Sequence, residues 1–147
     1  MRDIALRAYA EADFDDVTSL WLASWQSTGV PSQVTLAEVR ERWPAELAAG
    51  WIVHVAVTAD RILGFIAWRD DVLEQLFIAP DCQGRGVGKQ LLDYAKAAMP
   101  RGFRLHTALA SRAGKFYERE GLRRGESSIH PRLGHPIVDY HWTPLGA

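Results

Sequence analysis

Apolar residues recur every three or four positions in two stretches of the amino-terminal third, which is the spacing of one face of a helix. In the first stretch these positions are Phe14, Val17, Trp21 and Trp25. We expect Asp13 to act as the N-cap of this helix, because its carboxylate can accept a hydrogen bond from a free N–H group of the first turn. The sequence therefore predicts an amphipathic helix that begins near Phe14.

A capping box at the start of the second stretch indicates another helix. Thr35 can accept a hydrogen bond from an early N–H group, while Glu38 reaches back to the N–H group of Thr35. The apolar face that follows carries Leu36, Val39 and Trp43. Because Pro44 lacks an N–H group and its ring crowds the preceding turn, we expect this helix to be short or broken.

Runs of β-branched and alternating apolar residues predict strands in the remaining chain, and two more helices are expected among them. Pro100 closes the longer of these helices, and Gly121 caps the shorter one. The expected strands are residues 4–9, 51–57, 62–68, 72–79, 103–110, 122–129 and 137–142, and the expected helices are residues 87–98 and 112–120.

The order of these elements, β-α-α-β-β-β-α-β-α-β-β, predicts the α/β (α+β) class, with a mixed sheet flanked by helices. A doubly wound Rossmann fold would need a stricter alternation of strands and helices. Neither an internal repeat nor a linker-like Gly/Ser tract interrupts the sequence, and so we expect residues 1–147 to form a single domain.

The composition limits the function more than the fold. Hydrophobic residues make up 48% and charged residues 24% of the chain, as in a folded protein. The 17 basic and 18 acidic side chains nearly cancel, which argues against a nucleic-acid or membrane-surface partner. The single cysteine, Cys82, excludes an internal disulfide framework. The charged amino terminus and the lack of a run of roughly 20 apolar residues predict a cytoplasmic location.

A glycine-rich segment after the fourth expected strand has the features of an anion-binding loop. Gly84, Gly86 and Gly88 follow this strand and open a helix. Glycines let backbone N–H groups approach a ligand closely, and a helix start adds free donors and the positive end of the dipole. The Walker pattern does not fit, because Gln83 and Gln90 stand where it needs Gly and Ser or Thr. The dinucleotide pattern does not fit either, because the glycines run G-x-G-x-G and no early βαβ unit surrounds them.

The spacing that does fit is Q-x-x-G-x-G from Gln83 to Gly88. In its context it resembles the cofactor loop of the GNAT superfamily of N-acetyltransferases, which holds the pyrophosphate of coenzyme A. The strand before it ends in Phe77-Ile-Ala-Pro80, and the helix after it begins G-x-G-x-x-L-L, as in that family. Downstream, residues 113–122 resemble the A-x-x-F-Y-x-x-x-G-F signature of the same family. The specific part of the resemblance covers residues 72–122.

The resemblance implies a mostly antiparallel GNAT fold and an enzyme that transfers the acetyl group of acetyl-CoA directly to an amine. It also implies a bulge in the fourth strand, mapped onto residues 76–78, that frees N–H groups for the thioester oxygen and the pantetheine arm. The coenzyme A-binding residues that it implies are Leu76, Phe77, Ile78, Gln83, Gly84, Arg85, Gly86, Val87, Gly88 and Lys89.

Two side chains receive catalytic roles from the resemblance. Tyr117 aligns with the family's tyrosine that donates a proton to the leaving sulfur. Glu74 lies where some members place the carboxylate that takes the proton of the amine. Strand alternation puts Glu74 and Gln75 on opposite faces, but a bulge would shift that parity and leave Gln75 as the residue that faces the substrate.

Other features leave alternatives open. His54 and His106 lie on expected strands, where either could serve as a base or relay, and the histidine spacing predicts no metal site. Ala110 stands where the family often has Asn, which keeps a non-catalytic coenzyme A-binding or sensor domain as the alternative function. The acceptor amine, small molecule or peptide, and the length of the acyl group are not encoded recognisably in the variable loops at residues 27–34 and 128–136. A homodimer also stays open.

Overall fold

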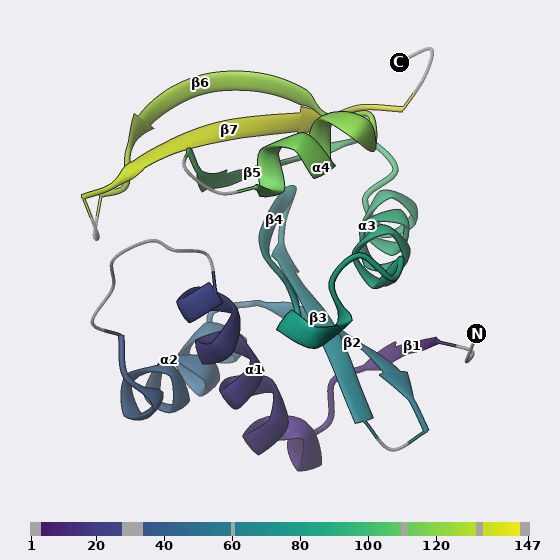
Figure 1. The fold of residues 1–147 in the computed structure, drawn as a ribbon, viewed down its shortest axis with the longest axis vertical. Coiled ribbons are helices and arrows are strands. Elements are labelled where there is room, and N and C mark those ends of the chain that lie inside the picture. Colours follow the sequence, from purple (N-terminus) through teal and green to yellow (C-terminus); the bar gives the residue numbers. More distant parts are fainter. Residues whose placement is uncertain (1–3, 28–33, 60, 110–111, 132–133, 145–147) are drawn as a thin grey trace.

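The computed structural model of the protein describes residues 4–27, 34–59, 61–109, 112–131 and 134–144. Its centre is one sheet with the strand order β1-β2-β3-β4-β5-β7-β6 (Figure 1). The strands are β1 (Ala5–Ala8), β2 (Ile52–Thr58), β3 (Arg61–Arg69), β4 (Val72–Ile78), β5 (Phe103–Ala108), β6 (Arg123–Ile129) and β7 (Pro136–Trp142). The helices are α1 (Phe14–Ser27), α2 (Leu36–Ala48), α3 (Val87–Ala98) and α4 (Ala113–Arg119), with short 3-10 turns η1 (Glu11–Asp13) and η2 (Pro80–Cys82).

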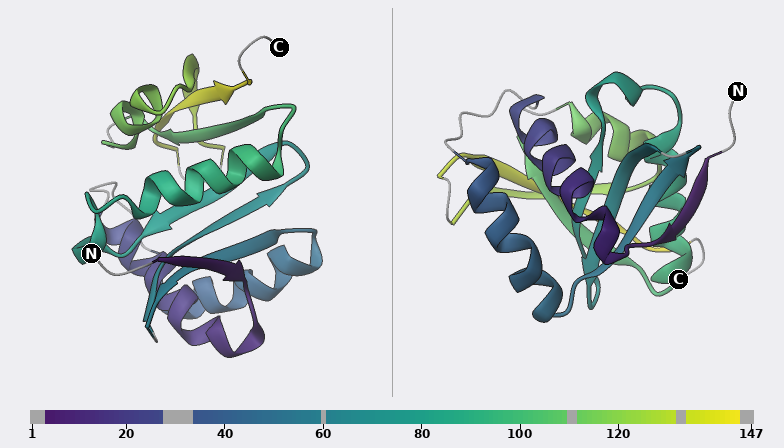
Figure 2. Two further views of the ribbon diagram at one scale, coloured as in Figure 1. Left: turned by 90° about the vertical axis from the view of Figure 1, so that its right-hand side faces the viewer. Right: turned by 90° about the horizontal axis from the view of Figure 1, so that it is seen from below.

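This element order confirms the predicted fold class. Neighbouring strands of the sheet pair antiparallel, except that β4 and β5 run parallel. The sheet is therefore mixed and mostly antiparallel, and helices lie on both of its sides (Figure 2). In the described part of the chain, no helix is long and apolar enough to cross a membrane.

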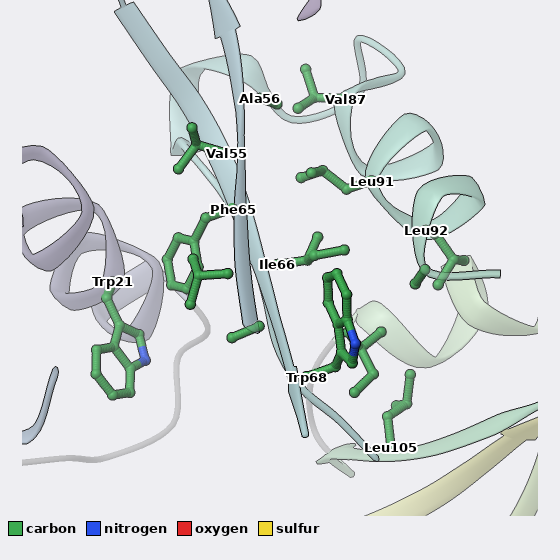
Figure 3. Packing of buried hydrophobic residues seen from close by; sticks show 14 of the residues in the cluster. Trp21, Val55, Ala56, Phe65, Ile66, Trp68, Val87, Leu91, Leu92 and Leu105 are labelled. Carbon is green, nitrogen blue, oxygen red and sulfur yellow. The ribbon is translucent and has the colours of Figure 1, made fainter. Parts of the chain in front are cut away.

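Alternation along β3 divides the core into two layers. Phe65 packs against Trp43 of α2, with 5.3 Å between the ring centroids, whereas Ile66 points toward Leu91 of α3 (Figure 3). All four side chains are fully buried. Because successive residues of a strand point to opposite faces, α1 and α2 cover one face of the sheet and α3 covers the other.

The helix that starts at the Thr35 capping box is continuous, contrary to the expected break at Pro44. Thr35 and Glu38 form both bonds of the box, and α2 runs through Pro44 to Ala48. A proline inside a helix costs about 3 kcal/mol or more. The apolar face of α2 offsets this cost, because Trp43 is fully buried and packs edge-on against Trp21 and Trp51.

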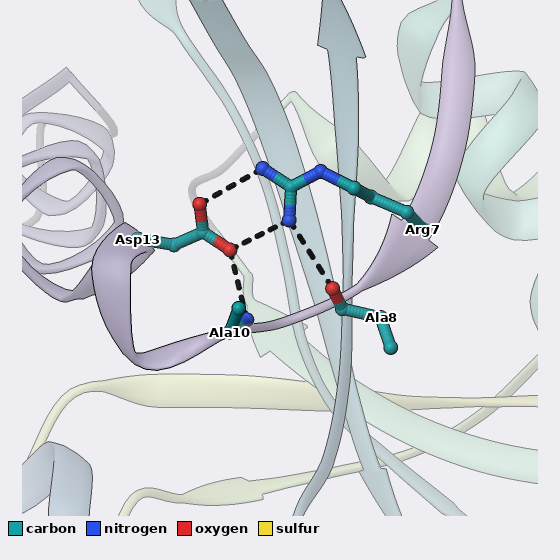
Figure 4. A network of polar contacts seen from close by, with 4 residues as sticks. All are labelled: Arg7, Ala8, Ala10 and Asp13. Atoms are coloured by element: carbon teal, nitrogen blue, oxygen red, sulfur yellow. Dashed lines mark hydrogen bonds and ion pairs between the residues drawn. The ribbon is translucent and has the colours of Figure 1, made fainter.

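Asp13 precedes α1 but does not cap it as predicted. Its carboxylate accepts hydrogen bonds from the Arg7 guanidinium at 2.7 and 2.9 Å and from the N–H group of Ala10 at 2.9 Å (Figure 4). The bond from Arg7 holds the pKa of Asp13 below its ordinary value. A bidentate arginine is a stronger partner than a free N–H group, and so the contact ties β1 to the start of α1 instead. The side chain of Trp25, which was expected on the apolar face of α1, lies outside the described part of the structure.

His54 is a half-buried titratable group beneath α3. Its Nε2 lies 2.8 Å from the hydroxyl of Tyr94, and its ring stacks on Trp68 with 5.4 Å between centroids. Its Nδ1 is buried and has no hydrogen-bond partner among the described residues. Burial lowers the pKa of His54, because the charged imidazolium would be poorly solvated there.

This lowered pKa predicts that acid destabilises the protein from about pH 6.5 downward, since the unfolded chain binds a proton that folded His54 refuses. Stability is then fully present above the unfolded pKa and falls until the pH drops below the lowered folded pKa. We expect His54→Gln, which keeps an acceptor for Tyr94, to flatten the dependence of the melting temperature on pH between pH 7 and pH 5. Thermal unfolding of the wild type and the variant at matched ionic strength measures this. Equal slopes of melting temperature against pH in the two proteins would contradict the prediction.

Candidate active site

Strands β4 and β5 separate soon after they begin. The two strands pair at Val72 and Arg104, and the rest of β4 pairs with β3 alone. The N–H group of Ala79 donates to the carbonyl of Leu63, which fixes the side of β4 that faces β3. Because backbone groups alternate along a ladder, the N–H group of Leu76 points away from β3, into the opening between β4 and β5. The polar groups of Phe77 face β3 instead.

A β-bulge lies in β4, two residues earlier than the resemblance implied. Gln75 pairs with Ala67 and Leu73 pairs with Trp68, which leaves Glu74 as the extra residue. Its carboxylate accepts a hydrogen bond from the Arg69 guanidinium at 2.9 Å, and its side chain is 22% exposed.

The bulge also decides the face on which Glu74 lies. The Phe65 side chain of β3 faces α1 and α2. Ala67 and Arg69 follow it at two and four residues, so their side chains lie on the same face of the sheet. The contact with Arg69 therefore puts Glu74 on the same face as Gln75, and simple alternation had put the two on opposite faces. Arg69 was not found by sequence reasoning. The available signal was its place directly before the tight turn at Asp70 and Asp71, which brings it across from β4.

The loop before α3 offers backbone donors in open space. Gly84 and Gly86 have φ values of 81° and 86°, and a Cβ atom added to either would meet nothing within 4 Å. Gly86 is the N-cap residue of α3 and has no side chain to satisfy the first turn. The first bond of the helix runs from the N–H group of Gln90 to the carbonyl of Gly86, so the N–H groups of residues 87–89 have no partner within the helix.

This donor set fits a pyrophosphate, because free N–H groups and the positive helix end converge where glycines leave room. Arg85 is exposed and forms no ion pair with a described residue, so it is available for a phosphate. Lys89 is bonded to Glu120 at 3.0 Å and lies 3.4 Å from Asp93, and these carboxylates raise its pKa. Lys89 must therefore exchange partners to contact a ligand.

Gly88 joins the two sequence motifs in space. A Cβ atom there would lie 3.4 Å from the ring of Phe116 and 3.8 Å from Ile78. The end of β4, the start of α3 and the start of α4 consequently meet at one point, although the motifs are far apart in sequence.

Tyr117 follows Phe116 on α4 and is 6% exposed. Its ring lies 5.4 Å from that of Phe116 and 5.6 Å from that of Tyr140. Burial alone raises the pKa of its phenol, and so the hydroxyl keeps its proton throughout the physiological range. It can therefore act as a proton donor.

Some sequence predictions fall outside what the structure describes. Ala110 and residues 28–33 and 132–133 of the two variable loops are among them. Within the described ranges, no group of three or more His, Cys, Asp or Glu side chains is arranged to hold a metal ion.

Comparison with known proteins supplies the family. Residues 49–123, just over half of the chain, match the family model described as an acetyltransferase (GNAT) domain. Over 129 residues the chain is 28% identical to YafP of Escherichia coli K12, described as an uncharacterized N-acetyltransferase, with 84% of this chain and 83% of that protein covered.

Solved structures share the fold at lower identity. A GCN5-related N-acetyltransferase from Rhodopseudomonas palustris superposes with a TM-score of 0.83 at 17% identity, covering 98% of both chains. The PaiA N-acetyltransferase of Thermoplasma acidophilum, solved with coenzyme A, gives a TM-score of 0.73 at 18% identity over 95% of this chain and 99% of that one.

Proposed function

The chain belongs to the GNAT family of acetyltransferases, and on that premise we propose that it transfers the acetyl group of acetyl-CoA directly to an amine of a small molecule or peptide. The observation that carries the proposal is the uncapped start of α3, where Gly84 and Gly86 leave open space before free N–H groups. A related fold is known with coenzyme A bound. Acetyl-CoA would supply an acetyl group already activated as a thioester.

The chain's own residues divide the binding work. The loop from Gln83 to Lys89 holds the pyrophosphate through its N–H groups, with Arg85 adding charge. The N–H group of Leu76 points into the opening between β4 and β5, where it can donate to the thioester oxygen as charge develops. Phe77 contributes indirectly, since its ring packs on Phe65 and fixes this part of β4. Ile78 packs beside Gly88 at the end of the opening.

Two side chains move protons in this proposal. Glu74, oriented by Arg69, takes a proton from the amine nitrogen, which frees its lone pair for attack on the carbonyl carbon. As the carbon–sulfur bond breaks, Tyr117 gives its phenolic proton to the sulfur. The hydroxyl of Tyr117 is protonated at neutral pH, as a general acid must be.

The test is a panel of small amines, amino acids and peptides, scored by thiol release from acetyl-CoA. We expect at least one class of amine to be acetylated, with the N-acetylated amine as the second product beside the free thiol. Binding of acetyl-CoA without turnover of any amine would point to a non-catalytic coenzyme A-binding domain. Failure of calorimetry to detect coenzyme A binding would remove the proposal altogether.

We expect Gly86→Ala to weaken coenzyme A binding by about tenfold or more, the loss of roughly 1.5–3 kcal/mol for a charged hydrogen bond. The added Cβ would occupy the open space in front of the loop. Calorimetry measures the affinity, and loss of ligand-induced melting stabilisation supports it independently.

Gly134→Ala is the matched control for this prediction. Gly134 has a φ of 78° and equally open space around a Cβ, so both variants carry the same kind of backbone strain. It lies between β6 and β7, where its N–H group donates to the carbonyl of His130, outside the α3 loop. Equal loss of affinity in the two variants would show that strain, and not the contact with phosphates, is responsible.

A further inference from the structure

A depression at the start of β5 is lined by basic side chains. It has a volume of about 250 Å³ and is formed by residues at the start of β5 and β6 and at the end of β7. Its basic residues are Arg101, Arg104, Arg123 and His141, and its acidic residue is Asp71. Three separate segments of the chain thus bring basic groups to one place, and a fourth contributes Asp71.

The sheet register places three of these residues in one row. Arg104 on β5 is directly opposite His141 on β7, and His141 is directly opposite Arg123 on β6. Side chains of directly paired residues share a face and stand roughly 5 Å apart. Like charges in such positions destabilise a sheet unless an opposite charge lies among them.

Four other arginines of this protein are neutralised by short ion pairs within the chain. Ion pairs of 2.6–2.9 Å join Arg7 to Asp13, Arg40 to Asp15, Arg61 to Asp81 and Arg69 to Glu74. Within the described ranges, Arg101, Arg104 and Arg123 have no ion pair, even with Asp71 in the same depression. Three guanidinium groups thus converge on a hollow whose lining residues include one carboxylate, Asp71, in a chain whose net charge is −1.

The depression is distinct from the α3 loop. Arg104 pairs with Val72 at the start of β4, whereas the loop follows the end of β4 at Ile78. Because these two positions are six residues apart along β4, the depression and the α3 loop are about 20 Å apart. A single phosphate group cannot contact both places.

We propose that this depression is a second ligand site, which binds a small anion with two or more carboxylate or phosphate groups. Guanidinium groups hold such groups bidentately, which suits three arginines that approach from different strands. Phe103 and Trp142 also border the hollow, but their rings point to the opposite face of the sheet, where Lys96 of α3 lies over the Trp142 ring. The site does not depend on acetyl transfer, although Glu74 lies only two residues beyond Val72 on the same strand.

Citrate is the probe for the test, by calorimetry on the whole chain at low salt. Binding by the wild type, weakened about tenfold or more in Arg104→Ala and in Arg123→Ala, is the expected result, since a charged hydrogen bond contributes roughly 1.5–3 kcal/mol. Exposed arginines rarely decide folding, and melting temperatures check that both variants are intact.

Arg124→Ala and Arg85→Ala are the matched controls. Arg124 is the next residue on β6 and points to the opposite face, and Arg85 is an exposed arginine of the α3 loop. Both should bind citrate as the wild type does. The proposal is overturned if the wild type binds no citrate, if Arg123→Ala binds it normally, or if binding is lost in Arg85→Ala alone.

Turnover then identifies the source of the anion. If it is part of the acceptor, Arg123→Ala raises KM for an amine that carries a carboxylate and not for the matching amide. If the anion is a separate ligand, Arg123→Ala leaves KM unchanged for both amines, and only the affinity for citrate changes. Because calorimetry needs no turnover, failure of the acetyltransferase proposal and failure of this one are distinguishable.

Discussion

Tyr117→Phe is expected to lower turnover by roughly 10²–10⁴-fold, the usual contribution of a positioned general acid, with little change in coenzyme A affinity. The substitution removes one hydroxyl and keeps the ring that packs between Phe116 and Tyr140. Burial alone raises the pKa of this phenol, so no charged partner is lost with the hydroxyl. The melting temperature should therefore stay close to that of the wild type. Steady-state kinetics with an accepted amine measures the effect.

Tyr140→Phe is the control for this experiment. It removes a hydroxyl from the neighbouring ring, where the hydroxyl donates a hydrogen bond to Glu118 at 2.9 Å. We expect turnover within a few-fold of the wild type, because that hydroxyl already has a partner. A stable Tyr117→Phe protein with normal turnover would leave thiolate departure to solvent or to the dipole of α3, and Tyr117 would be a core aromatic only.

Glu74→Gln should lower turnover by a similar roughly 10²–10⁴-fold if its carboxylate accepts the proton of the amine. Glutamine has nearly the same size and can still accept a hydrogen bond from Arg69, so the bulge should keep its shape. Coenzyme A affinity should not change, because the loop before α3 lies at the other end of β4. The acidic limb of the pH–rate profile should disappear in the variant.

Gln75→Ala separates this role from that of the adjacent residue. Gln75 shares the face of Glu74 and pairs with Ala67 across the hairpin. If a water held by Gln75 were the base, Gln75→Ala would lower turnover. Glu74→Gln would then keep both the turnover and the pH dependence of the wild type. That pattern would reassign the role.

Features that depend on neighbours in sequence could be predicted without a structure. The Thr35 capping box, the hairpin strands and the glycines before α3 each rest on contacts within a few residues, and the structure contains them as expected. The same locality explains why the element order was correct. Hydrophobic period and turn chemistry act within one element.

Predictions were wrong where a partner from another element competed with a local rule. Pro44 should interrupt α2, but the packing of Trp43 against other aromatic rings outweighs the missing bond. Asp13 should cap α1, but Arg7 from β1 captures its carboxylate. In both cases the deciding contact joins elements whose relative position is not encoded locally.

By itself the sequence determined which elements form and where an anion-binding loop opens a helix, because these depend on dihedral preferences and on the spacing of glycines and apolar residues. Only the tertiary structure decided that the bulge falls at Glu74, that Arg69 orients its carboxylate, and that Arg104, His141 and Arg123 form one row. Strand register sets all three, and a shift of one residue would move each side chain to the other face. Register follows from the packing of the whole sheet between its helices, which no single segment of the sequence specifies.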